Sequence, residues 1–214
     1  MIELLDTYPE HTRKALDRLS LSTRAKLEHL LDLYKAKPVS EPKEWGNFLT
    51  IKTQDFQLPN GKQITREYID KNKATVIVPV TIDDSIVFVI QPIALSKEGS
   101  LVEVPAGYVE TKKGEGEWEG GVRELAEETG YVPVKIEYLG EHYQDPGCIR
   151  QTVDTFLALW CEKKVEQQLD ADEYITSIEI PMSEAFDLLD SWYIKDANTY
   201  IALSKFYRWY NAKD

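Results

Sequence analysis

Residues 107–131 read GYVETKKGEGEWEGGVRELAEETGY, and the organisation of the chain follows from this segment. On an α-helix, which advances about 100° per residue, Glu124 and Glu128 lie about 40° apart, and Glu127 lies about 60° to the other side of Glu124. Leu125 points to a different side of the helix and can be buried. The segment therefore predicts one helix that carries three carboxylates in a cluster.

Such a cluster requires an explanation, because like charges at this spacing destabilise an isolated helix. A hard divalent cation, which carboxylate oxygens bind, would offset the repulsion. The alternative is a solvated acidic face, which is the common reason for a Glu-rich helix. Gly130 is suited to end the helix, whereas Gly120 and Gly121 lie inside it and each cost about 1 kcal/mol relative to alanine. These two glycines indicate that another backbone approaches the helix closely.

The segment resembles the Nudix box, in which a glycine, five residues, a glutamate and seven residues precede the pattern R-E-U-x-E-E-x-G-U, where U is bulky and apolar. Glu115, the seven residues after it and residues 123–131 agree with this pattern, with Tyr131 as the final bulky residue. Seven residues instead of five separate Gly107 from Glu115, and the extra pair falls in the loop at 111–114, where an insertion is readily accommodated. The chain is thus identified as a member of the Nudix family, which implies an α/β/α sandwich with a mixed sheet.

The resemblance also implies a chemistry and the residues that perform it. Nudix enzymes hydrolyse a nucleoside diphosphate linked to a further group, by attack of water on a phosphorus of the pyrophosphate. Glu124 and Glu128 resemble the principal ligands of Mg²⁺ or Mn²⁺, Glu127 resembles a residue that shares this duty, and the backbone carbonyl of Ala106 resembles a further ligand. Glu127 and Glu128 are therefore candidate catalytic residues as well as candidate metal ligands.

Other segments resemble the ADP-ribose pyrophosphatase group of this family. Residues 103–107, Glu-Val-Pro-Ala-Gly, match its entry to the box, and Pro146 lies sixteen residues after Gly130, where that group has a proline. Residues 196–203 resemble the D-A-x-T-x-x-A-L start of the group's last helix. An N-terminal tryptophan such as Trp45 stacks on the adenine across a dimer in some members. The resemblance implies a homodimer with Trp45, Glu103 and Pro146 at the substrate. The alternative for Trp45 is a core or interface anchor, because large aromatic side chains bury area wherever they lie.

One departure from the group leaves the substrate open. The group has Gln-x-Arg at the end of a strand, with the arginine on a phosphate, whereas this chain has Gln91-Pro92-Ile93. Arg66 or Arg150 could substitute. ADP-ribose, cleaved to AMP and ribose 5-phosphate, is the leading substrate. Another nucleotide sugar, a dinucleoside polyphosphate, an oxidised nucleotide, or a non-catalytic nucleotide-sensing role remain alternatives.

Three residues outside the ligand set complete the predicted site. Glu115 resembles the loop glutamate that pairs with Arg123, and this pair would pin the loop to the helix and orient the ligands. Glu173 lies just before the last predicted strand, where the ADP-ribose group carries a loop glutamate, and is the candidate general base. A base must come within about 3 Å of the water that it activates, and the alternative for Glu173 is a solvated acidic loop.

Composition limits the partners and the setting. The net charge of −12 argues against broad binding to nucleic acid or to an anionic membrane, because both need a basic surface. Cys148 and Cys161 form no CxxC motif and no disulfide framework. The acidic start lacks a signal pattern, and no apolar run approaches the length of a membrane span. We expect a cytoplasmic protein whose partner is a small-molecule nucleotide.

The hydrophobic pattern predicts helices at both ends of the chain and strands between them. Residues 1–37 predict two helices, so we expect an N-terminal helical extension with its linker at 1–43 and the Nudix domain at 44–214. Pro59-Asn60-Gly61 predicts an N-terminal hairpin with a type I′ turn, because Asn-Gly supplies positive φ. The other predicted strands are 74–82, 85–91, 101–104, 135–144, 152–161 and 174–180, and the predicted helices are 183–190, capped by Ser183, and 197–212.

Overall fold

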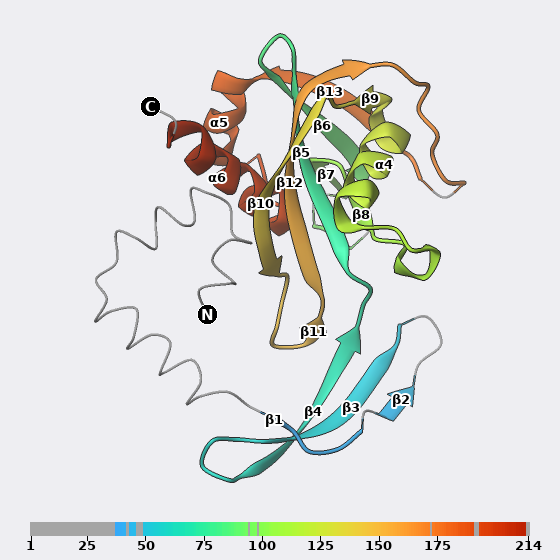
Figure 1. Ribbon diagram of the computed structural model, residues 1–214, viewed down its shortest axis with the longest axis vertical. Helices are drawn as coiled ribbons and strands as arrows, with labels where there is room; N and C mark the ends of the chain where they lie inside the picture. Colours follow the sequence, from blue (N-terminus) through green and yellow to red (C-terminus); the bar gives the residue numbers. More distant parts are fainter. Residues whose placement is uncertain are drawn as a thin grey trace. The chain divides into compact units, whose positions relative to one another are not determined.

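The computed structural model describes residues 37–41, 43–45, 49–93, 95–97, 99–171, 173–190 and 193–212 (Figure 1). Residues 1–36, which contain nearly all of the two predicted N-terminal helices, lie outside the described residues. The chain divides into two compact units, and each is described by itself. The first unit contains residues 1–71 and 145–151, and the second contains residues 72–144 and 152–214.

The first unit is built on a small sheet around the predicted hairpin. Strands β3 and β4 pair antiparallel, from Ile51 opposite Ile69 to Gln57 opposite Gln63. The strand order is β1-β3-β4-β11, and β2 also pairs with β3. The bounds are β1 Lys37–Pro38, β2 Lys43–Trp45, β3 Ile51–Gln57, β4 Gln63–Asp70 and β11 Ile149–Arg150.

The turn between β3 and β4 corrects the predicted type I′ turn. Gly61 has φ 82°, but Asn60 is not among the residues with positive φ, and a type I′ turn needs positive φ at both central residues. The N–H of Gly61 donates to the carbonyl of Leu58 at 2.9 Å. Pro59, whose ring fixes φ near −65°, suits the second position of a type I turn, and Gly61 follows it in the left-handed conformation.

The second unit is built on an eight-stranded mixed sheet of order β10-β12-β5-β6-β13. β12 runs parallel to β5, whereas β10, β6 and β13 pair antiparallel with their neighbours. The short strands β7, β8 and β9 pair with β6, β5 and β12. The bounds are β5 Ala74–Thr81, β6 Ser85–Pro92, β7 Ser100–Glu103, β8 Ala106–Tyr108, β9 Tyr131–Val132, β10 Lys135–Tyr143, β12 Thr152–Lys163 and β13 Thr176–Pro181.

Helices cover both faces of this sheet (Figure 1). Side chains alternate along β5, so Ile77 packs in the cluster of Leu125 on helix α4 (Glu117–Thr129). Val76 and Val78 point the other way, into the cluster with helices α5 (Met182–Asp190) and α6 (Ala197–Asn211). The predicted α/β/α sandwich with a mixed sheet is confirmed.

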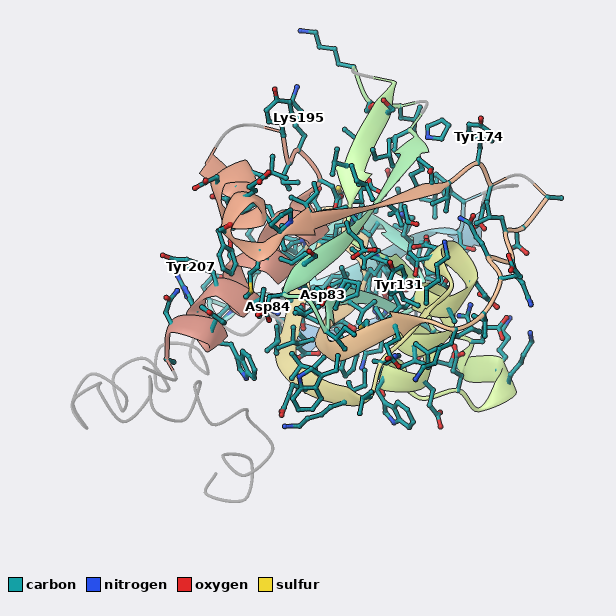
Figure 2. The ribbon with its side chains drawn as sticks, turned by 90° about the horizontal axis from the view of Figure 1, so that it is seen from above. Asp83, Asp84, Tyr131, Tyr174, Lys195 and Tyr207 are labelled. Carbon is teal, nitrogen blue, oxygen red and sulfur yellow. The ribbon has the colours of Figure 1, made fainter. Side chains whose placement is uncertain are left out.

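Two connections fix the ends of these elements. Asp83 and Asp84 form the turn of the predicted hairpin between β5 and β6, and Asp84 has φ 56° (Figure 2). Tyr131 lies just after the C-terminal end of α4, and its hydroxyl donates a hydrogen bond to Glu179 on β13. Tyr131 therefore joins the end of the helix to the sheet, which an aliphatic residue in its place could not do.

Several predicted boundaries shift by one or two residues, and two local explanations were wrong. Helix α5 begins at Met182, so Ser183 lies inside the helix and does not cap it. A Cβ at Gly120 or Gly121 would meet Glu115 and Thr75 side-chain atoms at 3.1 and 3.0 Å. Side chains, not a second backbone, therefore approach the helix at these glycines.

None of the helices in the described part of the chain has the length and apolar character that a membrane span requires.

Candidate functional site

Helix α4 is held at both ends by hydrogen bonds that the backbone N–H groups of glycines donate. At its start, the N–H of Gly116 donates to the Glu119 carboxylate at 2.8 Å. At its end, Gly130 adopts φ 78° and its N–H donates to the Ala126 carbonyl at 2.9 Å. A Cβ at Gly130 would lie 2.4 Å from the Val165 carbonyl oxygen, so both conformation and space require glycine there.

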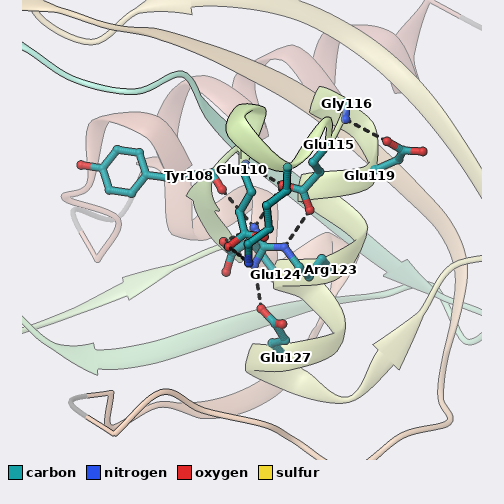
Figure 3. A network of polar contacts seen from close by, with 9 residues as sticks. Tyr108, Glu110, Glu115, Gly116, Glu119, Arg123, Glu124 and Glu127 are labelled. Carbon is teal, nitrogen blue, oxygen red and sulfur yellow. Dashed lines mark hydrogen bonds and ion pairs between the residues drawn. The ribbon is translucent and has the colours of Figure 1, made fainter.

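The guanidinium of Arg123 is the centre of the polar network beside this helix (Figure 3). Its Nε donates to Glu115 at 2.8 Å, its Nη1 donates to Glu127 at 2.7 Å, and its Nη2 lies 3.0 Å from Glu124. Nη2 also donates to the carbonyl of Tyr108 at 3.0 Å. One side chain thus joins three carboxylates to strand β8.

Glu115 is held by more than this ion pair. Its carboxylate also accepts the backbone N–H of Glu110 at 2.7 Å, which fixes the loop before the helix. The hydrogen bond from Arg123 lowers the pKa of Glu115, while the same bond raises the pKa of the Arg123 guanidinium. The structure therefore brings together the pair that the sequence singled out for support.

Glu128 has a different environment from its neighbours. Its side chain is buried, at 4% exposure, and within the described part of the chain its Oε2 atom has no hydrogen-bond partner. The pKa of Glu128 is raised to about 9, chiefly by burial and then by the charges of Glu124 and Glu173, against the opposing effect of a hydrogen bond from the backbone of Ala106. A buried, unpaired carboxylate oxygen is costly in a folded protein.

Glu124 lies between the arginine and this buried carboxylate. The pKa of Glu124 is raised to about 7, because the effect of burial outweighs the opposing effect of the nearby Arg123. A Cβ added to Gly107 would lie 2.0 Å from Oε1 of Glu124. An alanine at Gly107, in the middle of β8, would therefore displace the end of the Glu124 side chain.

The oxygen atoms of these carboxylates are suitable ligands for a hard divalent cation, but their side chains are not arranged around a common point in this structure. Within the described ranges, no three His, Cys, Asp or Glu side chains are arranged so that they could hold a metal ion together. Arg123 holds Glu124 and Glu127 in this structure, which accounts for the arrangement. The unpaired Oε2 of Glu128 and its like-charged neighbours nevertheless fit a cation, since a cation would supply the missing partner.

Two further carboxylates belong to the same charged group. Glu173 is exposed at the end of the loop after β12, where its carboxylate accepts the backbone N–H of Asp170 at 2.9 Å. Its charge raises the pKa of both Glu124 and Glu128. Glu103 also raises the pKa of Glu128, and burial raises that of Glu103 itself.

Sequence reasoning missed three contacts that position these groups. The side chain of Gln91 donates to Glu103 at 2.6 Å, whereas the sequence draws attention to Gln91 only through the missing arginine of the Gln-x-Arg pattern. Thr199, in the first turn of α6, accepts the backbone N–H of Val104 at 3.1 Å. Gln167 contacts the end of α4 through its side chain. A diagonal strand pair could have indicated Gln91, and the D-A-x-T pattern contains Thr199 without indicating its contact, whereas no sequence pattern signals Gln167.

The other predicted substrate residues belong to the first unit. Trp45 lies in β2 opposite Ile51, and its side chain lies outside the description. Arg66 is exposed on β4, and Pro146 is exposed in the turn before β11. Arg150 lies over the Tyr68 ring at 5.8 Å. The predicted substrate contacts of these residues stay predictions.

The sequence matches the family described as NUDIX domain over residues 71–203. The chain belongs to the Nudix family. This Nudix hydrolase is 33% identical over 159 residues to the ADP-ribose pyrophosphatase of Bacillus subtilis (strain 168), across 74% of this chain and 84% of that protein. A methanol dehydrogenase activator of Bacillus methanolicus gives the same identity and coverage. The GDP-mannose pyrophosphatase of Salmonella typhimurium is 28% identical over 196 residues, across 83% and 95% of the two chains.

A solved structure agrees with the fold. The crystal structure of an ADP compounds hydrolase superposes with a TM-score of 0.70, across 84% of this chain and 96% of that chain. The two sequences are 22% identical, so this likeness shows the fold alone.

Substituting Gly107 tests whether the Glu124 carboxylate must stay where it lies. We expect Gly107→Ala to displace Glu124 and to lower kcat by roughly a hundredfold, the loss typical of a catalytic group displaced by about 1 Å. Gly116→Ala is the matched control, because its Cβ would meet only an exposed carboxylate oxygen, at 3.2 Å. Equal activities of the two variants, measured at equal thermal stability, would contradict the close approach.

The raised pKa values predict how stability depends on pH in the absence of metal. The folded protein holds protons on Glu128 and Glu124 that the unfolded chain has released above pH 4.5, so stability should fall between about pH 5 and pH 9. Thermal unfolding in a chelating buffer would show a falling Tm across this range. The fall should be smaller in Glu128→Gln; an unchanged slope would contradict the assignment.

Proposed function

We propose that this Nudix hydrolase cleaves the pyrophosphate bond of a nucleoside diphosphate linked to a sugar in a metal-dependent reaction. ADP-ribose is the leading substrate, and the products would be AMP and ribose 5-phosphate. The observation that carries the proposal is the buried Glu128 carboxylate, which lacks a partner for Oε2 within the described residues and lies near the charges of Glu124 and Glu173. The resemblance to ADP-ribose and GDP-mannose pyrophosphatases supports the substrate class.

The proposed cation is Mg²⁺ or Mn²⁺, which prefer carboxylate and carbonyl oxygens. Glu124, Glu127 and Glu128 would hold it, together with the backbone carbonyl of Ala106. When bound, such an ion neutralises phosphate oxygens and lowers the pKa of a bound water. Arg123 and Glu115 have a positioning role in this proposal, since their ion pair fixes the loop before α4 and the side of the helix that carries the ligands.

Glu173 is the proposed general base. Its electrostatic effect on Glu124 and Glu128 supports its placement beside the ligands, and its exposure leaves it accessible to a water molecule. A carboxylate there would take a proton from the attacking water, directly or through one more water. The bond from Asp170 N–H holds one carboxylate oxygen, and the other oxygen would be the one that accepts the proton.

The choice of substrate depends on the positive charge that would contact its phosphates. In the sequence of the second unit the arginines are Arg123, already engaged by three glutamates, and Arg208, in the last turn of α6. Ile93 stands where ADP-ribose hydrolases have their arginine. This departure favours a second candidate, another nucleotide sugar such as GDP-mannose. The homodimer and the cytoplasmic setting stay predictions from the sequence.

A substrate panel tests the proposal. The purified protein with Mg²⁺ or Mn²⁺ should hydrolyse ADP-ribose or another nucleotide sugar to a nucleoside monophosphate and a sugar phosphate, identified by mass. Glu124→Gln and Glu128→Gln should lose activity by orders of magnitude while remaining folded, because each removes a charge that would hold the cation. A preference for nucleoside triphosphates, dinucleoside polyphosphates or oxidised nucleotides would refute the substrate class. Nucleotide binding without hydrolysis would favour a sensing module.

Replacing the proposed base separates its role from that of the ligands. Glu173→Gln should lower kcat by roughly 10²–10⁴-fold, the usual contribution of general base catalysis, with a KM close to that of the parent protein. The affinity for Mn²⁺ should hardly change, because Glu173 is not among the proposed ligands. A variant with unchanged kcat would remove Glu173 from the mechanism. Glu166→Gln, an exposed substitution in the same loop, is the control.

A further inference from the structure

The segment after β12 is bound along the C-terminal end of helix α4. The carbonyl of Gly130 accepts the backbone N–H groups of Lys164 and Val165, at 3.0 and 3.2 Å. The N–H of Gln168 donates to the carbonyl of Glu127 at 2.9 Å. The last carbonyls of a helix have no partner within the helix, so this segment supplies what α4 needs. The same segment then leads to Glu173.

One side chain within this segment contacts both sides of the proposed site. Nε2 of Gln167 donates to the carbonyl of Glu128 at 2.6 Å and to the carbonyl of Ile175 at 3.1 Å. An amide nitrogen has two hydrogens, so both bonds can form at once. Glu128 is the most buried of the proposed ligands, and Ile175 is a buried residue two positions after Glu173. The glutamine therefore spans the loop that carries the proposed base.

The loop itself has little else to hold Glu173 in place. Within the described residues, the hydrogen bonds of Glu173 join it to Asp170: the Glu173 carboxylate accepts Asp170 N–H, and Glu173 N–H donates to the Asp170 carbonyl at 3.0 Å. Residues 163–168, 170, 171, 173 and 174 are exposed, so hydrophobic burial contributes little here. The position of this turn relative to α4 thus depends on the contacts of Gln167 and on the backbone of Gln168.

We propose that Gln167 is a positioning residue, which holds the Glu173 turn at a fixed distance from the Glu128 end of α4. The kinetic consequence rests on the proposed function of Glu173, whereas the contact itself does not. Without the glutamine amide, the turn is held on one side by the backbone of Gln168 and on the other by the chain that leads into β13, and no side chain of the described residues joins the two sides. The Glu173 carboxylate then samples a wider range of positions, and fewer of them lie within reach of the attacking water.

Hydrogen exchange tests the contact without any substrate or metal. Gln167→Met keeps the length of the side chain and removes its donors, and Gln168→Met is the matched control, since the contact of Gln168 with α4 is made by its backbone. The amides of Gln168, Asp170 and Glu173 are hydrogen-bonded reporters. They should exchange about fivefold faster or more in Gln167→Met alone, the factor expected when one net hydrogen bond is lost. Equal exchange in both variants would overturn the proposal.

Kinetics then tests whether the effect passes through Glu173. Gln167→Met should lower kcat about tenfold or more with little change in KM, as expected for a displaced catalytic group. In a Glu173→Gln background the same substitution should have no further effect on kcat, because the group that it positions is gone. An equal loss in both backgrounds would show a merely structural role and overturn the proposal. If the parent protein hydrolyses no member of the panel, the proposed function fails, and hydrogen exchange still decides the contact.

Discussion

The site depends on the burial of the Glu128 carboxylate at the end of α4, near other negative charges. Burying a carboxylate beside like charges opposes folding, so other interactions must hold the helix against the sheet. Leu125 is fully buried and packs with Ile77 and Phe156, and Gly130 permits a tight end to the helix. Apolar packing and backbone contacts thus carry Glu128 into a position that its own charge disfavours.

Arg123 divides the acidic residues of α4 into two groups. Its planar guanidinium has five donors in a fixed arrangement, and here they serve Glu115, Glu127 and Glu124, as well as a backbone carbonyl. Glu128 receives none of these bonds. The arginine therefore pairs with three of the carboxylates and leaves Glu128 as the buried carboxyl group whose natural partner is a cation. A lysine could not replace it, because an ammonium group lacks the planar set of donors.

The features that follow from local spacing were predictable, and those that follow from tertiary contacts were not. Helical periodicity placed Glu124 and Glu128 together, and the two-residue period of β5 agrees with its helices on opposite faces. The predicted type I′ turn at Asn60 was wrong, because Pro59 favours a type I turn where Asn-Gly alone suggests type I′. Gln167 could not be found, since its two acceptors lie 39 and 8 residues away and follow no repeat.

The structure constrains the reaction more tightly than the substrate, and the reason is the distribution of charge. The carboxylates that would bind a cation are on one helix, and their relative positions follow from helical geometry. Binding of the substrate needs positive charge in a chain of net charge −12, and Arg123 is already held by glutamates. Substrate choice is therefore expected to depend on residues distant in sequence from the helix, which can change while the hydrolytic machinery stays the same.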